Sequence, residues 1–295
     1  MAERVAAARG GGVRSGDTVI LETGRVVSRD DIADLGTLLV VAAPLVAARA
    51  HAGQFVHVRP GERFDPLLRR PYSFNGIDRR AGEIELLVKP LGAGGDWIAQ
   101  RRPGDAVDLL GPLGTSFVVH RATTQLLLVA GGTGIAPMKV LAEQAAAAGR
   151  RVTLIMGGRS IHHLWPAHRL PPAVEYVTTT EDGSFGVRGR VTDALPQYLA
   201  WADQLCACGP WPMLAALGRM RDDAARATVV VPGRDVLLDA QIAVEQHMGC
   251  AMGVCRACVI VTAQGNARVC REGPVLSLGE VRFEGGEPAT VGLPA

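Results

Sequence analysis

The sequence predicts a multidomain protein with an N-terminal antiparallel β-barrel, a central α/β domain built on a parallel sheet, and a small cysteine-rich C-terminal domain. Three observations lead to this fold class. Short apolar runs separated by turn residues fill residues 19–122, a strand–glycine turn–helix–strand unit follows, and four of the six cysteines crowd into residues 250–270. A chain of 295 residues, 48% of them hydrophobic, is also long enough for two or three modest cores.

Residues 1–16 are expected to form a flexible lead, because they are rich in Gly and Arg and lack the apolar centre of a secretory signal. The longest apolar stretch, Leu38 to Ala48, contains Pro44 and is shorter than the ~20 residues of a transmembrane helix. The net charge is +2, with acidic and basic residues interspersed, which gives no footprint for nucleic acid or an anionic membrane. We therefore expect a cytoplasmic protein that binds neither nucleic acid nor a membrane.

Residues 17–122 are expected to form the all-β domain. Apolar runs such as VILETGRVV (19–27), LGTLLVVAAP (35–44) and AVDLLGPLG (106–114) are punctuated by Gly, Pro and Asp. Several short strands with turn signals at this spacing are typical of an antiparallel barrel or sandwich.

Two segments of this β domain could bind a flavin nucleotide. The strand RRPYSFN (69–75) carries an arginine for a phosphate, a tyrosine face for a flavin ring and a serine for its edge. An arginine and a tyrosine on an edge strand are, however, more often a solvated face. The second segment, KPLGAGGDW (89–97), reads as a glycine-rich turn that could approach a pyrophosphate or serve as a plain β-hairpin loop.

Residues 123–232 are expected to form the α/β domain. The strand LLLVA (126–130) runs into GGTGIAP (131–137), an Ala-rich helix and the strand VTLIMGG (152–158). The helix start, with Pro137 in its first turn, presents free N–H groups to a pyrophosphate. Its spacing is not GxGxxG, so a plain strand-to-helix turn stays an alternative.

A second candidate nucleotide segment is CGPWPM (208–213), which again follows a strand and opens a helix. It lies at the carboxyl end of its strand, where open α/β sheets bind their ligands. A lone cysteine such as Cys208 is also commonly a small core residue.

Residues 233–295 are expected to form the third domain. A helical-looking segment, DAQIAVEQHM (239–248), comes before the cysteines, and the strand-like VIVTAQG (259–265) lies within them. Roughly sixty residues are too few for a generous core, so this domain is expected to depend on a metal or cluster.

The cysteine spacing indicates an iron–sulfur cluster. Cys250, Cys255 and Cys258 form CxxxxCxxC, the spacing of the plant-type [2Fe-2S] loop, and Cys270 follows after eleven residues. Gly249 permits a sharp turn that aims backbone N–H groups at the sulfurs. Zinc sites usually bring two cysteines on each of two knuckles, so we favour a small [2Fe-2S] domain over zinc or unligated thiols.

Taken in order, RPYS (70–73), GPLG (111–114), GGTGIAP and CGPxxM resemble the ferredoxin-NADP reductase superfamily over about residues 17–230. The segments EQHMGCAMGVCRACVI (245–260), VCREGPV (269–275) and TTEDGSFGVRGRVTDAL (179–195) narrow this resemblance. They are similar to the electron-transfer subunit of the NAD-linked, two-subunit bacterial dihydroorotate dehydrogenase.

The resemblance implies binding residues for FAD, for NAD as a substrate and for the cluster. For FAD these are Arg70, Pro71, Tyr72 and Ser73, with Leu87, Val88 and Lys89 beside the flavin and Gly94 and Gly95 at its phosphates. For NAD they are Gly131, Gly132, Thr133, Gly134, Cys208, Gly209 and Pro210, and for the cluster Cys250, Cys255, Cys258 and Cys270. Two positions depart from the family: Gly95 stands where Thr is common, and Tyr72 where an aliphatic residue is more usual.

The resemblance also implies a function. An oxidoreductase subunit of this family passes electrons from NADH through FAD and the cluster to, or from, the FMN-containing dihydroorotate dehydrogenase catalytic subunit in pyrimidine biosynthesis, within a heterotetramer. The cofactors carry the chemistry, so no catalytic side chain is expected. Alternatives are the small subunit of an electron-bifurcating ferredoxin-NADP oxidoreductase and a zinc-stapled nucleotide-binding module.

Two details stay open at this point. Arg159 and Ser160 follow the second strand of the βαβ unit, where they could meet a 2′-phosphate of NADP or simply an adenine. Met248, Met252 and Val254 around the cysteine loop could form an apolar contact patch for a partner or a local core.

Overall fold

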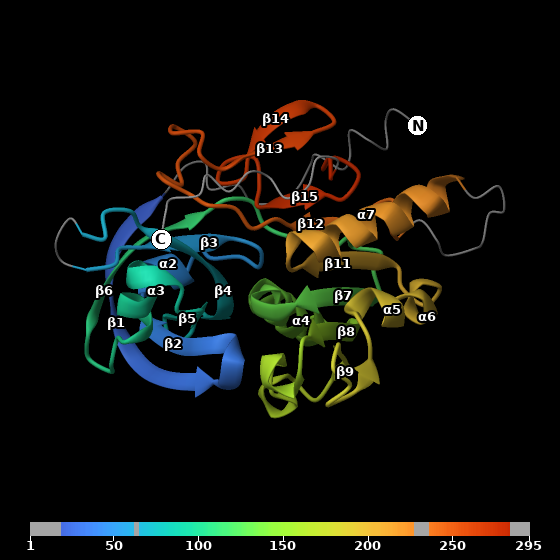
Figure 1. Ribbon diagram of the computed structural model, residues 1–295. Coiled ribbons are helices and arrows are strands. Elements are labelled where there is room, and N and C mark those ends of the chain that lie inside the picture. Colours follow the sequence, from blue (N-terminus) through green and yellow to red (C-terminus); the bar gives the residue numbers. More distant parts are fainter. Residues whose placement is uncertain (1–18, 62–64, 227–235, 284–295) are drawn as a thin grey trace.

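The computed structural model describes residues 19–61, 65–226 and 236–283. The predicted lead, residues 1–16, lies outside the described residues. In the described part a closed barrel lies beside a larger sheet flanked by helices, and the last strands of the chain lie above both (Figure 1). The predicted fold class is confirmed.

The barrel is closed and entirely antiparallel. Its strand order is β1-β2-β5-β4-β3-β6, and β6 pairs with β1 to close the ring. Alternate side chains fill its interior, among them Leu39, Val56 and Leu86, which are fully buried. The strands are β1 Ile20–Ile32, β2 Gly36–Ala42, β3 Phe55–Val58, β4 Arg70–Asp78, β5 Glu83–Val88 and β6 Ala106–Leu113.

The predicted strand RRPYSFN forms the start of β4, between β3 and β5. The predicted turn or hairpin loop at residues 89–97 is wrong, because most of this segment is the helix α3 (Gly92–Ala99). Ile98 and Ala99 are buried against the barrel, and this packing stabilises a helix that three glycines alone would disfavour. A shorter helix, α2, covers Pro44–Ala47.

The central sheet has seven strands in the order β10-β9-β8-β7-β11-β12-β15. Neighbours from β10 to β12 are parallel, and β15 pairs antiparallel with β12. The strands are β7 Gln125–Gly131, β8 Arg151–Gly158, β9 Val174–Thr180, β10 Val187–Arg188, β11 Gln204–Cys208, β12 Gln241–Ala243 and β15 Val275–Ser277.

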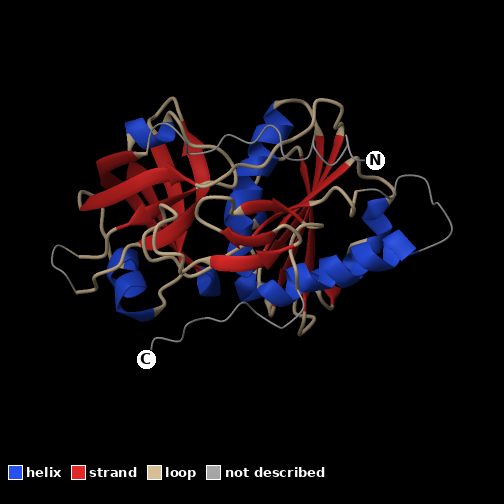
Figure 2. Ribbon diagram, turned by 90° about the horizontal axis from the view of Figure 1, so that it is seen from above, coloured by secondary structure: helices blue, strands red, loops and turns tan. Residues whose placement is uncertain are grey.

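Helices cover both faces of this sheet (Figure 2). Alternate residues of β7 point to different cores: Leu126 and Leu128 pack with α4 (Ile135–Ala147), whereas Leu127 and Val129 pack with α7 (Trp211–Arg226). The other helical segments are α5 Val191–Ala194, α6 Pro196–Leu199 and the 3-10 turns Ala33–Leu35, Gly132–Gly134, Ile161–His163 and Ala167–Arg169. No helix in the described ranges is long and apolar enough to cross a membrane.

The chain turns from β7 towards β8 on one side, while β11 lies on the other side of β7. The carboxyl ends of β7 and β11 therefore flank the point at which the strand order reverses. Ligands of open α/β sheets bind at such a switch point.

The predicted helix at residues 239–248 is wrong. This segment contains β12, which is inserted between β11 and β15. Ile242, Ala243 and Val244 are buried in succession, as expected for a strand covered on both faces rather than for one face of a helix. A separate hairpin, β13 (Val259–Thr262) and β14 (Gly265–Arg268), lies between Cys258 and Cys270.

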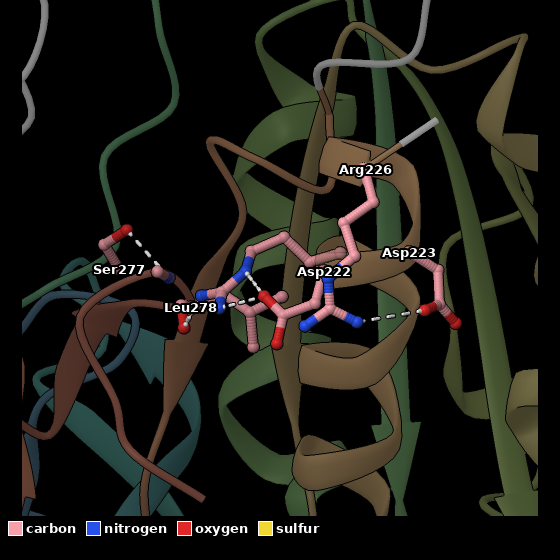
Figure 3. A network of polar contacts seen from close by, with 7 residues as sticks. Asp222, Asp223, Arg226, Ser277 and Leu278 are labelled. Atoms are coloured by element: carbon pink, nitrogen blue, oxygen red, sulfur yellow. Dashed lines mark hydrogen bonds and ion pairs between the residues drawn. The ribbon is translucent and has the colours of Figure 1, made fainter. Parts of the chain in front are cut away.

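The C-terminal segment thus shares the central sheet, while the predicted domain boundaries at residues 122 and 232 stay predictions. Arg221 of α7 links the helix to the end of β15 by donating to the Leu278 carbonyl at 2.7 Å. Asp222 accepts from the same guanidinium, and Arg226 with Asp223 forms a separate surface ion pair at 3.9 Å (Figure 3).

Candidate functional site

A cavity of about 600 Å³ lies where the barrel, the central sheet and the segment after β12 meet. Its barrel wall is the start of β4 with residues from β3 and β5. Its sheet wall is formed by the turns after β7 and β11. Its lining residues are Phe55, Arg70, Pro71, Tyr72, Ser73, Leu87, Lys89, Leu91, Thr133, Ala136, Gly209, Pro210, Trp211, Leu214, Val244, Glu245, Gln246, His247, Met248 and Pro274.

On the barrel wall, an arginine and a helix start form one corner. The Arg70 guanidinium donates to the Leu68 carbonyl at 2.6 Å. A Cβ atom on Gly94 would lie 2.8 Å from this guanidinium, so α3 packs directly against it. A guanidinium beside the free N–H groups of a helix start suits a phosphate.

Tyr72 is a half-buried part of the same wall. Burial raises the pKa of its phenol to about 12, although Arg70 opposes this. The phenol therefore stays neutral at physiological pH, and the ring presents an uncharged aromatic face to the cavity.

On the sheet wall, the two predicted nucleotide turns touch each other. Gly134 has no room for a side chain, because a Cβ would overlap with the Cys208 carbonyl and lie 2.7 Å from the Gly209 nitrogen. A Cβ on Gly131 would lie 2.8 Å from Pro210. The glycines thus let two helix starts approach one ligand site.

Cys208 lies beneath this wall and is 1% exposed. Burial, with a smaller contribution from Glu245, raises the pKa of its thiol. It is thus a protonated core residue in this structure, which agrees with the alternative given above that a lone cysteine is commonly a small core residue.

The predicted binding residues divide into two groups. Those that line the cavity are Arg70, Pro71, Tyr72, Ser73, Leu87, Lys89, Thr133, Gly209 and Pro210. Those that lie outside the lining are Val88, Gly94, Gly95, Gly131, Gly132, Gly134 and Cys208. In the second group, Gly94, Gly131 and Gly134 are close-packed positions, where a Cβ would meet Arg70, Pro210 and Cys208 respectively.

The sequence did not predict the third wall of the cavity. Val244 to Met248 line the cavity immediately after β12, and Glu245 among them reaches solvent there. The surrounding protein removes part of the hydration of the Glu245 carboxyl, and this desolvation raises its pKa. The positive charge of Lys89 opposes the rise. The buried run Ile242 to Val244 was the available signal: as a parallel strand, it would have placed these residues at the carboxyl edge of the sheet.

Arg159 and Ser160 follow β8 and lie outside the cavity lining. The Arg159 guanidinium and the Ser160 hydroxyl contact the two ring nitrogens of His163, at 3.1 and 3.0 Å.

Backbone N–H groups in the cysteine region donate hydrogen bonds to its thiols. The Met252 and Cys255 N–H groups both donate to Cys250 Sγ at 3.4 Å. The Cys270 N–H donates to Cys258 Sγ at 3.5 Å. Ala251, Gly253 and Arg256 have φ values of 55°, 83° and 60°, which turn the loop tightly around the sulfurs.

The four thiols are arranged as two pairs, Cys250 with Cys255 and Cys258 with Cys270. Desolvation opposes the shift, but backbone N–H donation lowers the pKa of Cys250 to about 7. A hydrogen bond from Cys270 lowers the pKa of Cys258 to about 6, and that contact raises the pKa of Cys270. All six cysteines are free of disulfides.

This donor set fits a two-iron cluster. The four thiols form two pairs, Cys250 with Cys255 and Cys258 with Cys270, and a [2Fe-2S] centre takes four thiolates. The N–H groups aimed at sulfur are the usual second layer of such a centre.

The fold and the site define an oxidoreductase module that combines a nicotinamide-nucleotide site with an iron–sulfur centre. Sequence profiles agree: residues 245–282 match the iron–sulfur cluster binding domain of dihydroorotate dehydrogenase B, and residues 128–218 match the oxidoreductase NAD-binding domain. The chain is 40% identical over 261 residues to the dihydroorotate dehydrogenase B (NAD(+)) electron transfer subunit of Geobacillus thermodenitrificans, covering 87% of this chain and 96% of that one. The corresponding subunit of Bacillus caldolyticus is 38% identical over the same shares.

This chain belongs to the family of dihydroorotate dehydrogenase B electron transfer subunits. Solved structures share its fold. An NADH-dependent reduced ferredoxin-NADP oxidoreductase studied for flavin-based electron bifurcation has a TM-score of 0.74, with 24% identity and 92% of each chain covered. A ferredoxin NADP⁺ reductase from Neisseria gonorrhoeae, solved with FAD and NADP, has a TM-score of 0.58, with 19% identity and 69% of this chain and 91% of that chain covered.

Proposed function

We propose that this chain is the electron-transfer subunit of a dihydroorotate dehydrogenase and carries electrons between NADH and a separate FMN-containing catalytic subunit. One observation supports this most strongly. Met248 lines the cavity, and Cys250, the first cysteine of the cluster motif, is only two residues further along the chain. Two residues span at most ~7 Å, so a flavin in the cavity and a cluster on the loop would be neighbours.

The residues around the cavity would hold FAD and the nicotinamide nucleotide. Arg70 and the start of α3 would take the FAD phosphates, and Tyr72 with Leu87 would cover the flavin. The turns at Thr133 and Gly209 would receive the nucleotide. When bound, the flavin supplies two-electron chemistry towards the nicotinamide and one-electron chemistry towards an iron–sulfur centre.

The side chains of this protein would position the cofactors, balance their charge and exclude water from the cavity. Arg70 neutralises phosphate charge without losing its own, because a guanidinium stays protonated. Tyr72 excludes water from one face while remaining neutral. Lys89 and Glu245 both line the cavity, and the positive charge of Lys89 opposes the rise in the pKa of the Glu245 carboxyl.

The exposed cluster loop would contact the catalytic subunit. Val254 is 78% exposed and Met252 is 51% exposed, on the loop that wraps Cys250. Met248 instead lines the cavity, so the proposed contact patch is Met252 and Val254 alone. We further propose a cytoplasmic heterotetramer of two such subunits and two catalytic subunits.

The proposal is tested by co-expressing this chain with the FMN-containing catalytic subunit and purifying through a tag on either one. Co-purification, together with NADH-driven reduction of orotate that needs both chains, would support it. Val254→Asp should weaken the complex at least tenfold, whereas Val27→Asp, at a 46% exposed valine of the barrel, should not. No complex with the catalytic subunit, or equal NADH-driven turnover without this chain, would contradict it.

A further inference from the structure

Arg268, the last residue of β14, lies among the cluster ligands without being one. In the hairpin it pairs with Val259, the residue directly after Cys258, and it is two residues before Cys270. Its guanidinium Nη1 donates to the Gly253 carbonyl at 2.9 Å. The side chain therefore connects the end of β14, just before the turn that carries Cys270, to the loop that carries Cys250 and Cys255.

This hydrogen bond fixes the direction of one peptide group. In a trans peptide the C=O and the N–H point opposite ways. Because the Gly253 carbonyl points at Arg268, the N–H of Val254 points to the other side of this peptide, within the loop whose Met252 and Cys255 N–H groups donate to Cys250 Sγ. Glycine is needed at position 253, since φ is +83° and a Cβ would lie 3.2 Å from the Arg268 Nη1.

Glu272 holds the guanidinium in place. The Arg268 Nε donates to Glu272 Oε2 at 3.0 Å, the Arg268 backbone N–H donates to the same oxygen at 2.7 Å, and Nη2 bonds the other carboxylate oxygen. The pair is partly exposed, with 37% and 40% of the side chains accessible. Glu272 thus orients Arg268 and offsets part of its charge.

We propose that Arg268 is a positioning residue that raises the reduction potential of the iron–sulfur cluster, and that Glu272 limits this increase. The proposal rests on the proposed function, because it assumes that the four cysteines hold a cluster. A reduced cluster carries one more negative charge than an oxidised one, so a nearby cation and N–H donors at the sulfurs favour the reduced form. A nearby carboxylate favours the oxidised form.

The test is an anaerobic redox titration of the full chain, purified with its FAD and cluster, in which the EPR signal of the reduced cluster is followed. Arg268→Gln removes the charge and the hold on Gly253. It should lower the midpoint potential by 59 mV or more, which is a tenfold change in a one-electron equilibrium. Arg268→Lys keeps the charge but loses the planar grip, so a smaller lowering is expected.

Two further variants separate an electrostatic role from a structural one. Glu272→Gln should move the potential upward, opposite to Arg268→Gln, whereas damage to the loop would shift both variants the same way. Arg271→Gln removes an exposed arginine that directly follows Cys270, and it should shift the potential by less than half as much as Arg268→Gln.

Iron content and the EPR line shape should match wild type in Glu272→Gln and Arg268→Lys, which keeps the test valid if Arg268→Gln assembles poorly. An unchanged potential in Arg268→Lys together with no upward shift in Glu272→Gln would overturn the proposal, as would shifts of the same sign. A wild-type chain without iron or an EPR signal would instead contradict the proposed function.

Discussion

His57 illustrates how a single buried group ties stability to pH. It lies on β3, it is 1% exposed, and neither ring nitrogen has a hydrogen-bond partner among the described residues. Burial, with a smaller contribution from Arg69, lowers the pKa of its imidazole from 6.5 to about 4. Folding therefore keeps His57 neutral at pH values where the unfolded chain would protonate it.

We predict that His57 contributes to acid sensitivity. Between pH 6.5 and 4 the unfolded state binds the extra proton, so the free energy of unfolding falls as the pH falls, by up to about 3 kcal/mol. The variant His57→Phe has no imidazole to protonate, so it should lose this part of the pH dependence. At pH 7 it should be as stable as wild type, because the substitution removes a buried polar group without a hydrogen-bond partner. Urea unfolding of both proteins at pH 7 and pH 5 measures the stability at pH 7 and its loss on acidification. An equal loss in wild type and His57→Phe would contradict the prediction.

Gly94 is a residue whose lack of a side chain shapes the site. A methyl group there would lie 2.8 Å from the Arg70 guanidinium and would push it out of position. We predict that Gly94→Ala lowers FAD retention through gel filtration at least fivefold, while Ala93→Ser, at the exposed neighbouring position, leaves it unchanged. FAD content per chain, measured by absorbance after denaturation, is the readout, and full retention in Gly94→Ala would count against the assignment of this corner to the phosphates.

Individual residues were predictable from the sequence where their chemistry depends on local spacing. CxxxxCxxC places three thiols on one loop, and RPYS places an arginine and an aromatic ring on one strand, whatever the rest of the chain does. Glu245 was not predictable in this way, because its position in the cavity depends on β12 joining the sheet beside β11.

At the scale of elements, α4 is fixed to the barrel by a buried cation. Lys139 has 6% of its side chain exposed and lies 3.1 Å from Glu85 of β5 and 2.7 Å from Glu143. It also donates to the Asn75 carbonyl of β4 at 3.2 Å. The helix α4, which follows the turn at residues 131–134, is thereby tied to β4, which begins at Arg70.

We predict that Lys139→Met destabilises the protein by ~2 kcal/mol, because it leaves Glu85 and Glu143 close together without their shared cation. It should also raise the KM for NADH more than it lowers kcat, since the two walls of the cavity lose their connection. The double variant Lys139→Met/Glu85→Gln should recover part of the stability. Urea unfolding and diaphorase kinetics test this, and additive losses in the double variant would contradict the coupling.

The two elements mispredicted from sequence failed for related reasons. The α3 segment contains three glycines and reads as a turn, yet burial of Ile98 and Ala99 against the barrel favours a helix. The β12 segment has good helix formers around it, yet pairing on both sides makes it a strand. In both cases long-range packing outweighs local propensity.

At the scale of the whole molecule, the order of the motifs along the chain predicted the order of the architecture. The sequence did not reveal that the C-terminal segment completes the central sheet and also forms a wall of the cavity. That arrangement depends on contacts between residues far apart in sequence, such as β12 with β11. It brings the cluster loop next to the proposed flavin site.

Electron flow from NADH to the cluster loop is tested most directly by the visible spectrum of the purified chain, with iron, zinc and flavin quantified, before and after NADH is added without oxygen. The purified chain should contain one FAD and two irons, with flavin bands and iron–sulfur shoulders that bleach on adding NADH. A colourless protein that holds zinc and does not respond to NADH would contradict the proposed path of electrons from the cavity to the cluster loop.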